Sequence, residues 1–484
     1  MIVMKFGGTS VEDAPAIERV AEIVRSRAAE DPIVVVSALA RVTDQLLAAG
    51  QAAAAGDRDQ ALESARALRQ RHRRTASELL SGHHFSRLQP ALESNFDLLQ
   101  ELLTRIAALQ ELSSRNTDCL LSFGELLSSE IVSAALAARG LACERVDARE
   151  CIITDASHTR AALLFNETRT RLQARLRPLL ERRAIPVMGG FIGSTLDGTP
   201  TTIGRGGSDY SAAIVGAALD AARIEIWTDV PGMMTTDPNL CPEARLIQEI
   251  SFEEAAELAS FGATVLHPAT LLPAIEKNIP VCVLNSRDPA GAGTCIRAHA
   301  PRSRDPVRAI AAKRHTTIVN VAGERAWIPR GFLREVLAVF DRHNCQVDIV
   351  ASSQVSISLA VESDSATPEL VTDLERFAQV SCEPRQAIVS VVGENLRGRQ
   401  GIAARVFGSV SGAGVNVRMI SQGASEINIS FVIHEEDVPA AVRHLHSDLF
   451  ADATAEDSRQ WLPSGVRRGP PASERPLRLR AEEG

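Results

Sequence analysis

The chain opens Met1-Ile2-Val3-Met4-Lys5-Phe6-Gly7-Gly8-Thr9-Ser10, an apolar segment that runs directly into two glycines. This segment is typical of a buried strand followed by a tight turn. Asp13 is a candidate helix cap, Pro15 fits the first turn, and apolar residues recur at helical spacing from 17 to 24. A second apolar strand is expected at residues 33–37. Strand, helix and strand in this order predict a βαβ unit and therefore a parallel sheet.

Further strands alternate with helices from residue 141 onward. Strands are expected at residues 185–188 and 224–227, among others, and Ser251 with Glu254 forms the capping-box pattern of a helix start. We therefore expect residues 1–300 to form one α/β domain.

Residues 45–115 interrupt this alternation. They are rich in Ala, Leu, Gln, Arg and Glu and show no strand pattern, which predicts a long helical insertion. The strongly basic stretch at residues 66–74 is flanked by acidic residues, so we interpret it as a solvated helix face and not as a ligand patch.

Past residue 310 the sequence repeats itself at an offset of 70 residues, without a gap. The matches are 318–324 with 388–394, Gly331 with Gly401, 346–349 with 416–419, and 357–359 with 427–429. Each copy reads as strand, glycine-opened helix, strand and strand. The repeat therefore predicts two copies of a small α+β module.

The composition of the 484 residues excludes several classes of protein. Hydrophobic residues make up 45% and charged residues 23%, which is typical of a folded soluble chain of several domains. A net charge of −8 with one tyrosine argues against nucleic-acid binding, and no apolar run approaches the length of a membrane span. The eight cysteines form no C-x-x-C pair, so we expect reduced thiols in a cytoplasmic protein without a secretory signal. Residues 451–484, with several prolines and no periodicity, are expected to be disordered.

Two glycine-rich segments carry the pattern of anion sites. In the first, Lys5 ends a strand and Gly7 with Gly8 allow backbone N–H groups to approach phosphate oxygens. The second is Gly-Arg-Gly-Gly-Ser-Asp at 204–209, where Ser208 is expected to cap the following helix. Since Thr228 and Asp229 follow another strand of the same sheet, we expect all three segments to face one crevice.

Six motifs together resemble the aspartate kinase family, in the family's order over residues 1 to about 450. They are KFGGTS at 5–10, SFGE at 122–125, GRGGSD at 204–209, WTDVPG at 227–232, FGATVLHP at 261–268 and SQGASE at 421–426. The resemblance is to the monofunctional, lysine-sensitive type. It implies an amino-acid-kinase-like parallel-sheet sandwich with helices on both faces, followed by two α+β ACT modules.

The resemblance also implies the division of the chain. The catalytic domain would span 1–300, the first ACT module 310–384 and the second 385–444. In the family as we interpret it, the second module is inserted in the first, so a last strand near residues 445–450 would return to the first module.

The implied activity is transfer of the ATP γ-phosphoryl group to the β-carboxylate of L-aspartate, giving 4-phospho-L-aspartate. This is the first step toward lysine (through diaminopimelate), threonine and methionine. A carboxylate with a reference pKa near 3.9 is already ionised at neutral pH, so the reaction needs charge neutralisation and alignment but no general base. Mg²⁺ would bridge the phosphates of ATP.

The resemblance assigns roles residue by residue. The catalytic residues would be Lys5 and Asp209. Substrate-binding residues would be Thr43, Glu125, Arg205 and Ser208, with Arg205 and Glu125 receiving the α-carboxylate and the α-ammonium group. ATP-binding residues would be Lys5, Phe6, Gly7, Gly8, Thr228 and Asp229, and the nucleotide pocket would be lined by Met234, Asn239, Thr264 and Val265. The amino-acid effector would bind Phe332, Leu333, Val347 and Asp348 at an interface between subunits, and no residue is assigned as a metal ligand.

Several positions depart from the family's pattern and leave alternatives open. Met234, Asn239 and Thr264 replace a frequent tyrosine, arginine and lysine around the nucleotide. Pro329 and Gln354 replace residues common around the lysine pocket, so threonine is the alternative to lysine as effector. Two competing functions remain. One is a catalytically weak ACT-type amino-acid sensor, and the other is a kinase of the same superfold that acts on glutamate, carbamate or a nucleotide. We expect a homodimer or a dimer of dimers.

Overall fold

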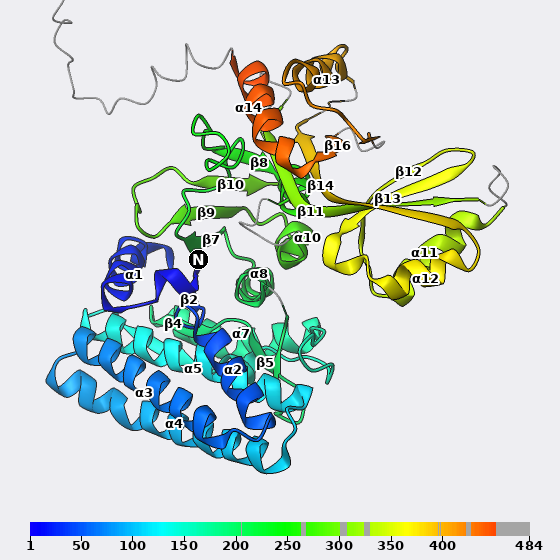
Figure 1. Cartoon of the computed structure of the whole chain (residues 1–484). Helices are drawn as coiled ribbons and strands as arrows, with labels where there is room; N and C mark the ends of the chain where they lie inside the picture. The colour runs from blue at the N-terminus through cyan, green and yellow to red at the C-terminus, as the bar shows by residue number, and fades with distance from the viewer. Residues whose placement is uncertain are drawn as a thin grey trace, which may run out of the picture.

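The structure is a computed structural model (Figure 1). It describes residues 1–204, 206–262, 268–300, 307–323, 330–394, 396, 398–422 and 427–451. The predicted disordered tail lies, from residue 452 onward, outside the described residues.

Residues 1–300 are built on an eight-stranded sheet with the order β3-β4-β2-β1-β7-β9-β10-β8. Its strands are β1 (Ile2–Phe6), β2 (Pro32–Val36), β3 (Cys143–Val146), β4 (Ile185–Gly189), β7 (Ile224–Thr228), β8 (Glu249–Ser251), β9 (Val281–Asn285) and β10 (Thr294–Arg297). From β3 to β9 all neighbours are parallel, as the βαβ pattern predicts, whereas β10 is antiparallel to β9. Strands β1, β2 and β4 are buried along their whole length, because helices cover both faces.

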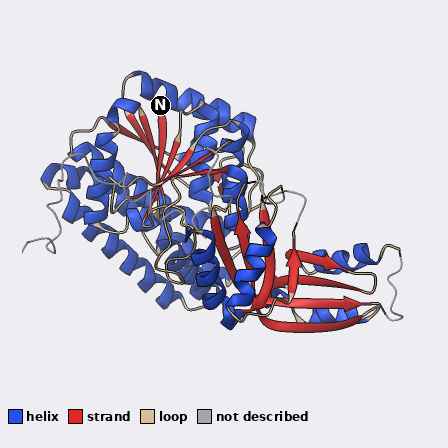
Figure 2. Cartoon of the chain, turned by 90° about the horizontal axis from the view of Figure 1, so that it is seen from above, coloured by secondary structure: helices blue, strands red, loops and turns tan. Residues whose placement is uncertain are grey.

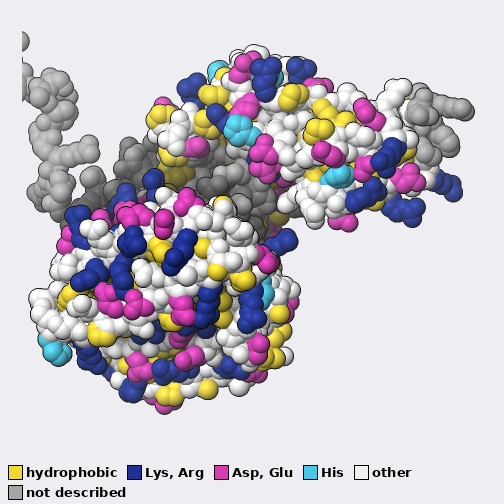
Figure 3. Space-filling view, turned by 60° about the horizontal axis from the view of Figure 1, so that its bottom comes forward, with side chains coloured by type: hydrophobic (Ala, Val, Ile, Leu, Met, Phe, Trp, Pro, Cys, Tyr) yellow, Lys and Arg dark blue, Asp and Glu magenta, His cyan; other side chains and the backbone are white. Residues whose placement is uncertain are grey.

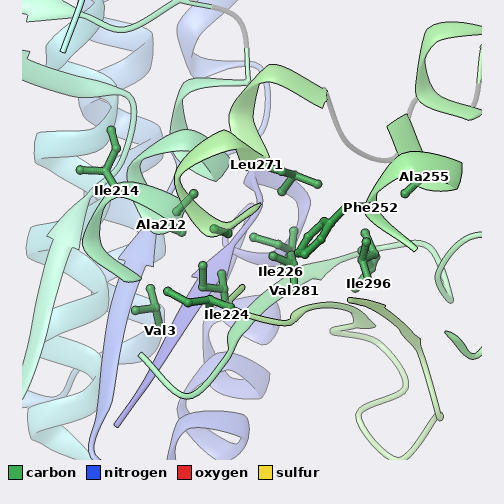
Figure 4. Packing of buried hydrophobic residues seen from close by; sticks show 14 of the residues in the cluster. Val3, Ala212, Ile214, Ile224, Ile226, Phe252, Ala255, Leu271, Val281 and Ile296 are labelled. Atoms are coloured by element: carbon green, nitrogen blue, oxygen red, sulfur yellow. The ribbon is translucent and has the colours of Figure 1, made fainter. Parts of the chain in front are cut away.

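Helices form a layer on each side of this sheet (Figure 2). They are α1 (Ala14–Ser26), α5 (Ser114–Ala138), α6 (Ala148–Cys151), α7 (Phe165–Glu181), α8 (Gly207–Leu219), α9 (Phe252–Ser260) and α10 (Leu272–Glu276). Because successive strand residues point to opposite faces, Val3 joins the core with α7 and α8 while Met4 joins the core with α1 and α5. Figure 4 shows Val3 on the first of these faces, with Ile214 of α8 and Phe252 of α9.

Local signals at two helix starts are confirmed. Asp13 caps α1 by accepting a hydrogen bond from the Ala16 N–H, with proline in the first turn. Ser251 and Glu254 form both hydrogen bonds of a capping box at the start of α9.

Three helices, α2 (Val42–Ala54), α3 (Arg58–Leu79) and α4 (Gly82–Leu109), occupy the segment for which a helical insertion was expected, and pack along α5 (Figure 1). Their buried apolar residues, such as Leu68, Leu92 and Phe96, join the α1–α5 core. Helix α5 is long and apolar enough to cross a membrane, but 72% of its most apolar window is buried inside the protein. It is therefore typical of a core helix between the sheet and the insertion.

The surface in Figure 3 shows basic and acidic side chains interspersed over the same face. A mixed surface of this kind offers no large field of one sign on the side that the figure shows.

The C-terminal region forms a six-stranded antiparallel sheet with the order β12-β13-β11-β14-β16-β15. Its strands are β11 (Ala309–Ala322), β12 (Val347–Ser352), β13 (Ser356–Glu362), β14 (Gln379–Val392), β15 (Met419–Ser421) and β16 (Asn428–His434). Its helices are α11 (Phe332–Arg342), α12 (Pro368–Glu375), α13 (Ile402–Gly412) and α14 (Val438–Leu449). The long strands β11 and β14 pair over most of their length, so each contributes to both modules.

The pairing of β11 with β14 shows that the order of insertion is the reverse of the predicted one. The first module is continuous and uses residues 316–322 of β11 with β12, β13 and the first half of β14. The second module uses residues 386–392 of β14 with β15 and β16, and its fourth strand comes from residues 309–313 of β11. The first module is therefore inserted in the second, which begins before residue 310 and continues beyond 444.

The predicted strand near residues 445–450 is also wrong, because Val438–Leu449 is helix α14. Its buried residues Val438, Ala441, Val442, Leu445 and Leu449 recur at helical spacing and pack in the core of the second module.

The 70-residue repeat holds through the helices. Helices α11 and α13 begin 70 residues apart, each after a left-handed glycine, Gly331 or Gly401. The last strand differs: Ile357 pairs with Val321, and its counterpart Ile429 pairs with Val391, so this strand is offset by 72 residues. The gapless match is therefore wrong at this strand, because two extra residues lie in the second module before β16.

One cysteine pair contradicts the expectation of reduced thiols. Cys282 and Cys295 form a disulfide between β9 and β10, where they are direct partners in the antiparallel register. Their 13-residue separation carries no recognisable motif, so only the strand pairing brings them together.

The α/β region at residues 1–300 and the C-terminal region share an interface. Thr235 hydrogen bonds with His446 of α14 at 2.9 Å and accepts the N–H of Ile310 at 2.7 Å. Helix α9 adds a hydrogen bond from Asn428 to Glu257 at 2.6 Å.

Candidate active site

Lys5 and Asp209 form a buried ion pair at the edge of the sheet where the parallel strands end. Lys5 is the penultimate residue of β1, in the central part of the sheet, and Asp209 lies in the first turn of α8. The Lys5 Nζ is 2.6 Å from the Asp209 Oδ1, and the side chains are 11% and 14% exposed. The structure thus joins the two glycine-rich segments that the sequence singled out.

The first glycine loop packs tightly against the neighbouring strand ends. Gly7 donates its N–H to the carbonyl of Trp227 at 2.9 Å, and a Cβ at Gly7 would lie 3.7 Å from the Lys5 Nζ. A Cβ at position 7 would therefore lie in ordinary van der Waals contact with the ammonium group of Lys5 and with the backbone that leads to Thr228.

The second glycine loop places the start of α8 beside the same cavity. Gly206 (φ 70°) is the N-cap, and no side chain caps the helix. The prediction that Ser208 caps this helix is therefore wrong, because Ser208 already lies in its first turn. Its backbone packs so closely on Gly190 that a Cβ there would be 2.8 Å from the Ser208 Cα.

Glu125 brings an incompletely paired carboxylate into this region from α5. Its side chain is 3% exposed; Oε1 accepts the N–H of Ala38 at 3.1 Å, and Oε2 has no hydrogen-bond partner. Burial raises the pKa of Glu125 to about 8, against the hydrogen bond from Ala38 and the positive charge of Lys5, which lower it. The group is thus mostly protonated at neutral pH and disposed to ionise when a cation approaches Oε2.

A cavity of about 630 Å³ unites these groups. Its lining includes the predicted residues Lys5, Gly8, Thr43, Glu125, Ser208 and Asp209. Thr43 belongs to the first turn of α2, directly after the loop at residues 37–41. The cavity therefore brings together the ammonium group of Lys5, the N-terminus of α8 and the Glu125 carboxylate, whose Oε2 has no hydrogen-bond partner.

The predicted nucleotide-side residues lie next to this cavity and beyond it. Phe6 is buried in β1, and Thr228 ends β7, where its hydroxyl donates to the Asp229 carboxylate at 3.3 Å. Met234 and Asn239 line a second cavity of about 340 Å³. The opposite wall of that cavity is Ile310, Ala311 and Ala312 of β11, so the ACT region contributes to it.

Three predicted site residues cannot be placed. Arg205, Thr264 and Val265 lie outside the described residues.

The predicted effector residues show one unforeseen contact. Asp348 on β12 is 6% exposed at its side chain and already pairs with Lys313, whose Nζ is 2.6 Å from Oδ2. Phe332 is buried against Phe377 and Val347 packs on the same core, whereas Leu333 is 43% exposed. Within the described residues no side chain caps the start of α11 at Gly331, and the N-terminus of a helix favours a carboxylate.

Sequence reasoning missed several residues that shape the cavity. Phe191 and Thr159 line it with left-handed backbones, at φ 63° and 70°. Asp118 is fully buried beneath the wall, and it accepts hydrogen bonds from His158, Thr159 and Thr202. The glycines at 189 and 190 before Phe191 indicated that another segment of backbone could approach closely there. Nothing in the sequence indicates that Asp118 accepts from these three donors.

The cavity lining includes the carboxylates of Asp209 and Glu125, which are oxygen donors of the kind that Mg²⁺ prefers. The part of the chain that the structure describes contains no group of three or more His, Cys, Asp or Glu residues that could hold a metal. Mg²⁺ in phosphotransferases usually has one or two protein carboxylates and keeps its remaining positions for phosphates and water.

Comparisons with known proteins agree along the chain. The amino acid kinase family matches residues 1–285, and an ACT domain family matches residues 389–449. "Aspartokinase 2, chloroplastic" of Arabidopsis thaliana is 37% identical, covering 93% of this chain and 84% of that protein. The lysine-sensitive aspartokinase 3 of Escherichia coli K12 is 37% identical, covering 93% of this chain and 99% of that protein. Crystal structures of the E. coli enzyme superpose with TM-scores of 0.80 for the complex with aspartate and ADP (R-state) and 0.78 for the complex with lysine and aspartate (T-state). Both are 36% identical in sequence and cover 93% of this chain and 100% or 99% of theirs.

Proposed function

The chain belongs to the aspartokinase family, and from this premise we propose that it transfers the γ-phosphoryl group of ATP to the β-carboxylate of L-aspartate. The product would be 4-phospho-L-aspartate, the first intermediate toward lysine, threonine and methionine. The observation that carries the proposal is the cavity in which the Lys5–Asp209 pair and the free oxygen of Glu125 meet.

Glu125 gives the cavity its preference for an amino acid. An α-ammonium group placed at Oε2 would satisfy an oxygen that has no partner and would draw Glu125 into its charged form. Arg205, by its place in the sequence between Gly204 and Gly206, would take the α-carboxylate. The side-chain carboxylate of aspartate would then be directed toward Lys5.

Lys5 and the start of α8 provide the electrostatics of transfer. The substrate carboxylate is ionised at neutral pH, so the protein's contribution is alignment and stabilisation of the charge on the transferred group. Asp209 holds the Lys5 ammonium group at 2.6 Å and so fixes its direction. The positive end of α8 adds favourable dipoles at the same cavity.

Mg²⁺ would be held mainly by ATP phosphates, and when bound it would neutralise phosphate charge. Thr228 and Asp229 lie at the end of β7, beside the glycine loop, and would contact the nucleotide. Met234 and Asn239 would border its base at the cavity shared with β11.

We propose feedback control by lysine through the ACT modules. Asp348 would pair with the ε-ammonium of the effector and the open start of α11 would receive its α-carboxylate. The effector must then replace Lys313, which already provides an ammonium group to Asp348. Threonine has no ammonium group in its side chain and cannot make this exchange, which is why lysine is preferred.

Assembly and location are part of the same proposal. A homodimer or dimer of dimers would form through the ACT region, with the enzyme in the cytoplasm.

Turnover measured as aspartate-dependent ADP release, with ATP and Mg²⁺, tests the function. We expect turnover with aspartate, none with glutamate, and near-complete loss in Lys5→Ala. An intact protein that binds aspartate or lysine but releases no ADP would support the amino-acid sensor instead. Inhibition by threonine and not by lysine would reject the effector and leave the kinase activity standing.

A further inference from the structure

The arginines of helix α3 do not all face solvent as the sequence suggested. Five lie between residues 66 and 74. Four pair with carboxylates of the insertion: Arg66 with Glu63, Arg69 with Glu93 and Asp97, Arg73 with Glu93, and Arg74 with Glu78. Arg71 pairs with no carboxylate in the part of the chain that the structure describes, and it is partly buried toward the catalytic domain.

Arg71 donates instead to two backbone carbonyls. Its Nη1 is 2.8 Å from the oxygen of Ala40, and its Nη2 is 3.2 Å from the oxygen of Glu12. These carbonyls belong to the loops that follow β2 and β1, two adjacent parallel strands of the sheet. Because a guanidinium group is a rigid planar fork, contacts from both of its ends fix the separation of the two loops.

The two loops are in close contact with each other. The N–H of Ala40 donates to the carbonyl of Gly8 at 3.2 Å, and a Cβ at Gly8 would lie 3.1 Å from the Ala38 oxygen. The two loops therefore pack directly against each other at Gly8.

The loop at residues 37–41 also holds Glu125. Its Ala38 N–H donates to the Glu125 Oε1 at 3.1 Å, and its residues line the same cavity as Lys5. The Ala40 carbonyl that accepts from Arg71 and the Ala38 N–H that donates to Glu125 thus lie within one stretch of three residues.

We propose that Arg71 is a positioning residue of the active site, which holds the loop at 37–41 in the geometry required for the amino-acid substrate. This inference rests on the proposed function, because its readout is the use of aspartate. Helix α3 thereby contributes to the active site although Arg71 itself does not line the cavity.

Loss of the two Arg71 hydrogen bonds should lower kcat/KM for aspartate more than it changes the KM for ATP. The stronger contact is with the substrate-side loop, and displacement of a binding wall by about 1 Å can cost about a hundredfold in rate. The Ala38 N–H also stabilises the charged form of Glu125 and so lowers its pKa against the effect of burial, as do the backbone N–H of Glu125 itself and the positive charge of Lys5. A loosened loop should therefore raise the midpoint of the pH profile for aspartate binding.

The test compares three variants of the full-length enzyme. Arg71→Met keeps the apolar stem and removes all donors, and Arg71→Lys keeps the charge but cannot reach both carbonyls as a fork. Arg74→Met, on the same helix with a side chain 79% exposed, is the matched control. Each is measured for kcat and KM with both substrates, for the pH profile of aspartate binding and for thermal unfolding.

We expect kcat/KM for aspartate to fall about 10- to 100-fold in Arg71→Met, with a change in the KM for ATP below about threefold. Arg71→Lys should be intermediate, Arg74→Met should match the wild type, and the pH midpoint should rise only in the Arg71 variants. Arg71→Met kinetics equal to Arg74→Met would overturn the inference. So would an equal loss toward both substrates that follows a lowered Tm, since that would indicate general destabilisation. A wild-type enzyme without turnover would reject the proposed function itself, a result distinct from either.

Discussion

The pH dependence of aspartate binding should report on Glu125. If its carboxylate receives the α-ammonium group, only the ionised fraction of the free enzyme binds aspartate. With a pKa of about 8, that fraction is about one half at pH 8 and about one hundredth at pH 6. The apparent Kd for aspartate should therefore weaken about 50-fold between pH 8 and pH 6, with uptake of aspartate releasing nearly one proton at the lower pH.

Calorimetry of the full-length enzyme in buffers of different ionisation enthalpy measures both quantities. Glu125→Gln should bind aspartate weakly at every pH and lose the profile. Glu130→Gln is the matched control, because Glu130 lies on the same helix and pairs with Arg145 outside the cavity. A Kd that is flat from pH 6 to pH 8 in the wild type, or a profile that survives in Glu125→Gln, would refute the reasoning.

The raised pKa of Glu125 also affects the stability of the fold. A rise in pH, which strengthens aspartate binding, lowers the stability of the free enzyme. The folded-state pKa of Glu125 is raised above its ordinary value of 4.5, so the native state binds more protons than the unfolded chain between about pH 4.5 and 8. This contribution to stability is present at low pH and is lost as the pH rises through that window. The cost at pH 8 and above has an upper bound of about 5 kcal/mol, at about 1.4 kcal/mol per pKa unit. Without ligand, Glu125→Gln should therefore unfold at a higher Tm than the wild type at pH 8.5, and a lower Tm there would contradict the burial argument.

Three further outcomes test the remaining roles. Asp209→Asn should lower kcat about 10- to 150-fold, the effect of losing about 1.5–3 kcal/mol of interaction with the Lys5 ammonium group 2.6 Å away, with little change in the KM for aspartate. An unchanged kcat in steady-state assays would remove Asp209 from the mechanism. Asp348→Asn should abolish inhibition by lysine at full basal activity, whereas Lys313→Met should make lysine inhibit at a lower concentration, because no internal ammonium group then occupies Asp348. Dose–response curves that coincide in all three enzymes would reject this effector site. Met234→Tyr should lower the KM for ATP, since tyrosine adds a hydrogen-bond donor that a thioether lacks, and a KM that is unmoved or higher would show that position 234 does not contact the base.

The sequence alone predicted those features that depend on neighbours along the chain. Asp13 and the Ser251–Glu254 pair cap their helices with groups three residues away, so a short window contains all the information. The apolar strands and the 70-residue repeat are visible for the same reason, because burial on a strand or helix leaves a short period in the sequence. The pairing of Lys5 with Asp209 was expected from the resemblance of the two glycine-rich segments to motifs of the family; the first segment follows β1 of the parallel sheet, whereas the second follows a strand at Pro200–Thr202 in a separate two-stranded sheet.

Tertiary structure decided what depends on which distant segments meet. The sequence does not show that strand β11 belongs to two modules, because its pairing partners lie far away along the chain. For this reason the insertion was assigned to the wrong module. Cys282 and Cys295, Lys313 and Asp348, and Arg71 with the carbonyl of Ala40 are likewise contacts across the fold. A basic stretch looks the same in sequence whether an arginine faces water or a loop, and only the packing of α3 against α1 and α2 turns Arg71 toward the active site. The chemistry of the site was therefore encoded locally, whereas the geometry that supports it arises from long-range packing.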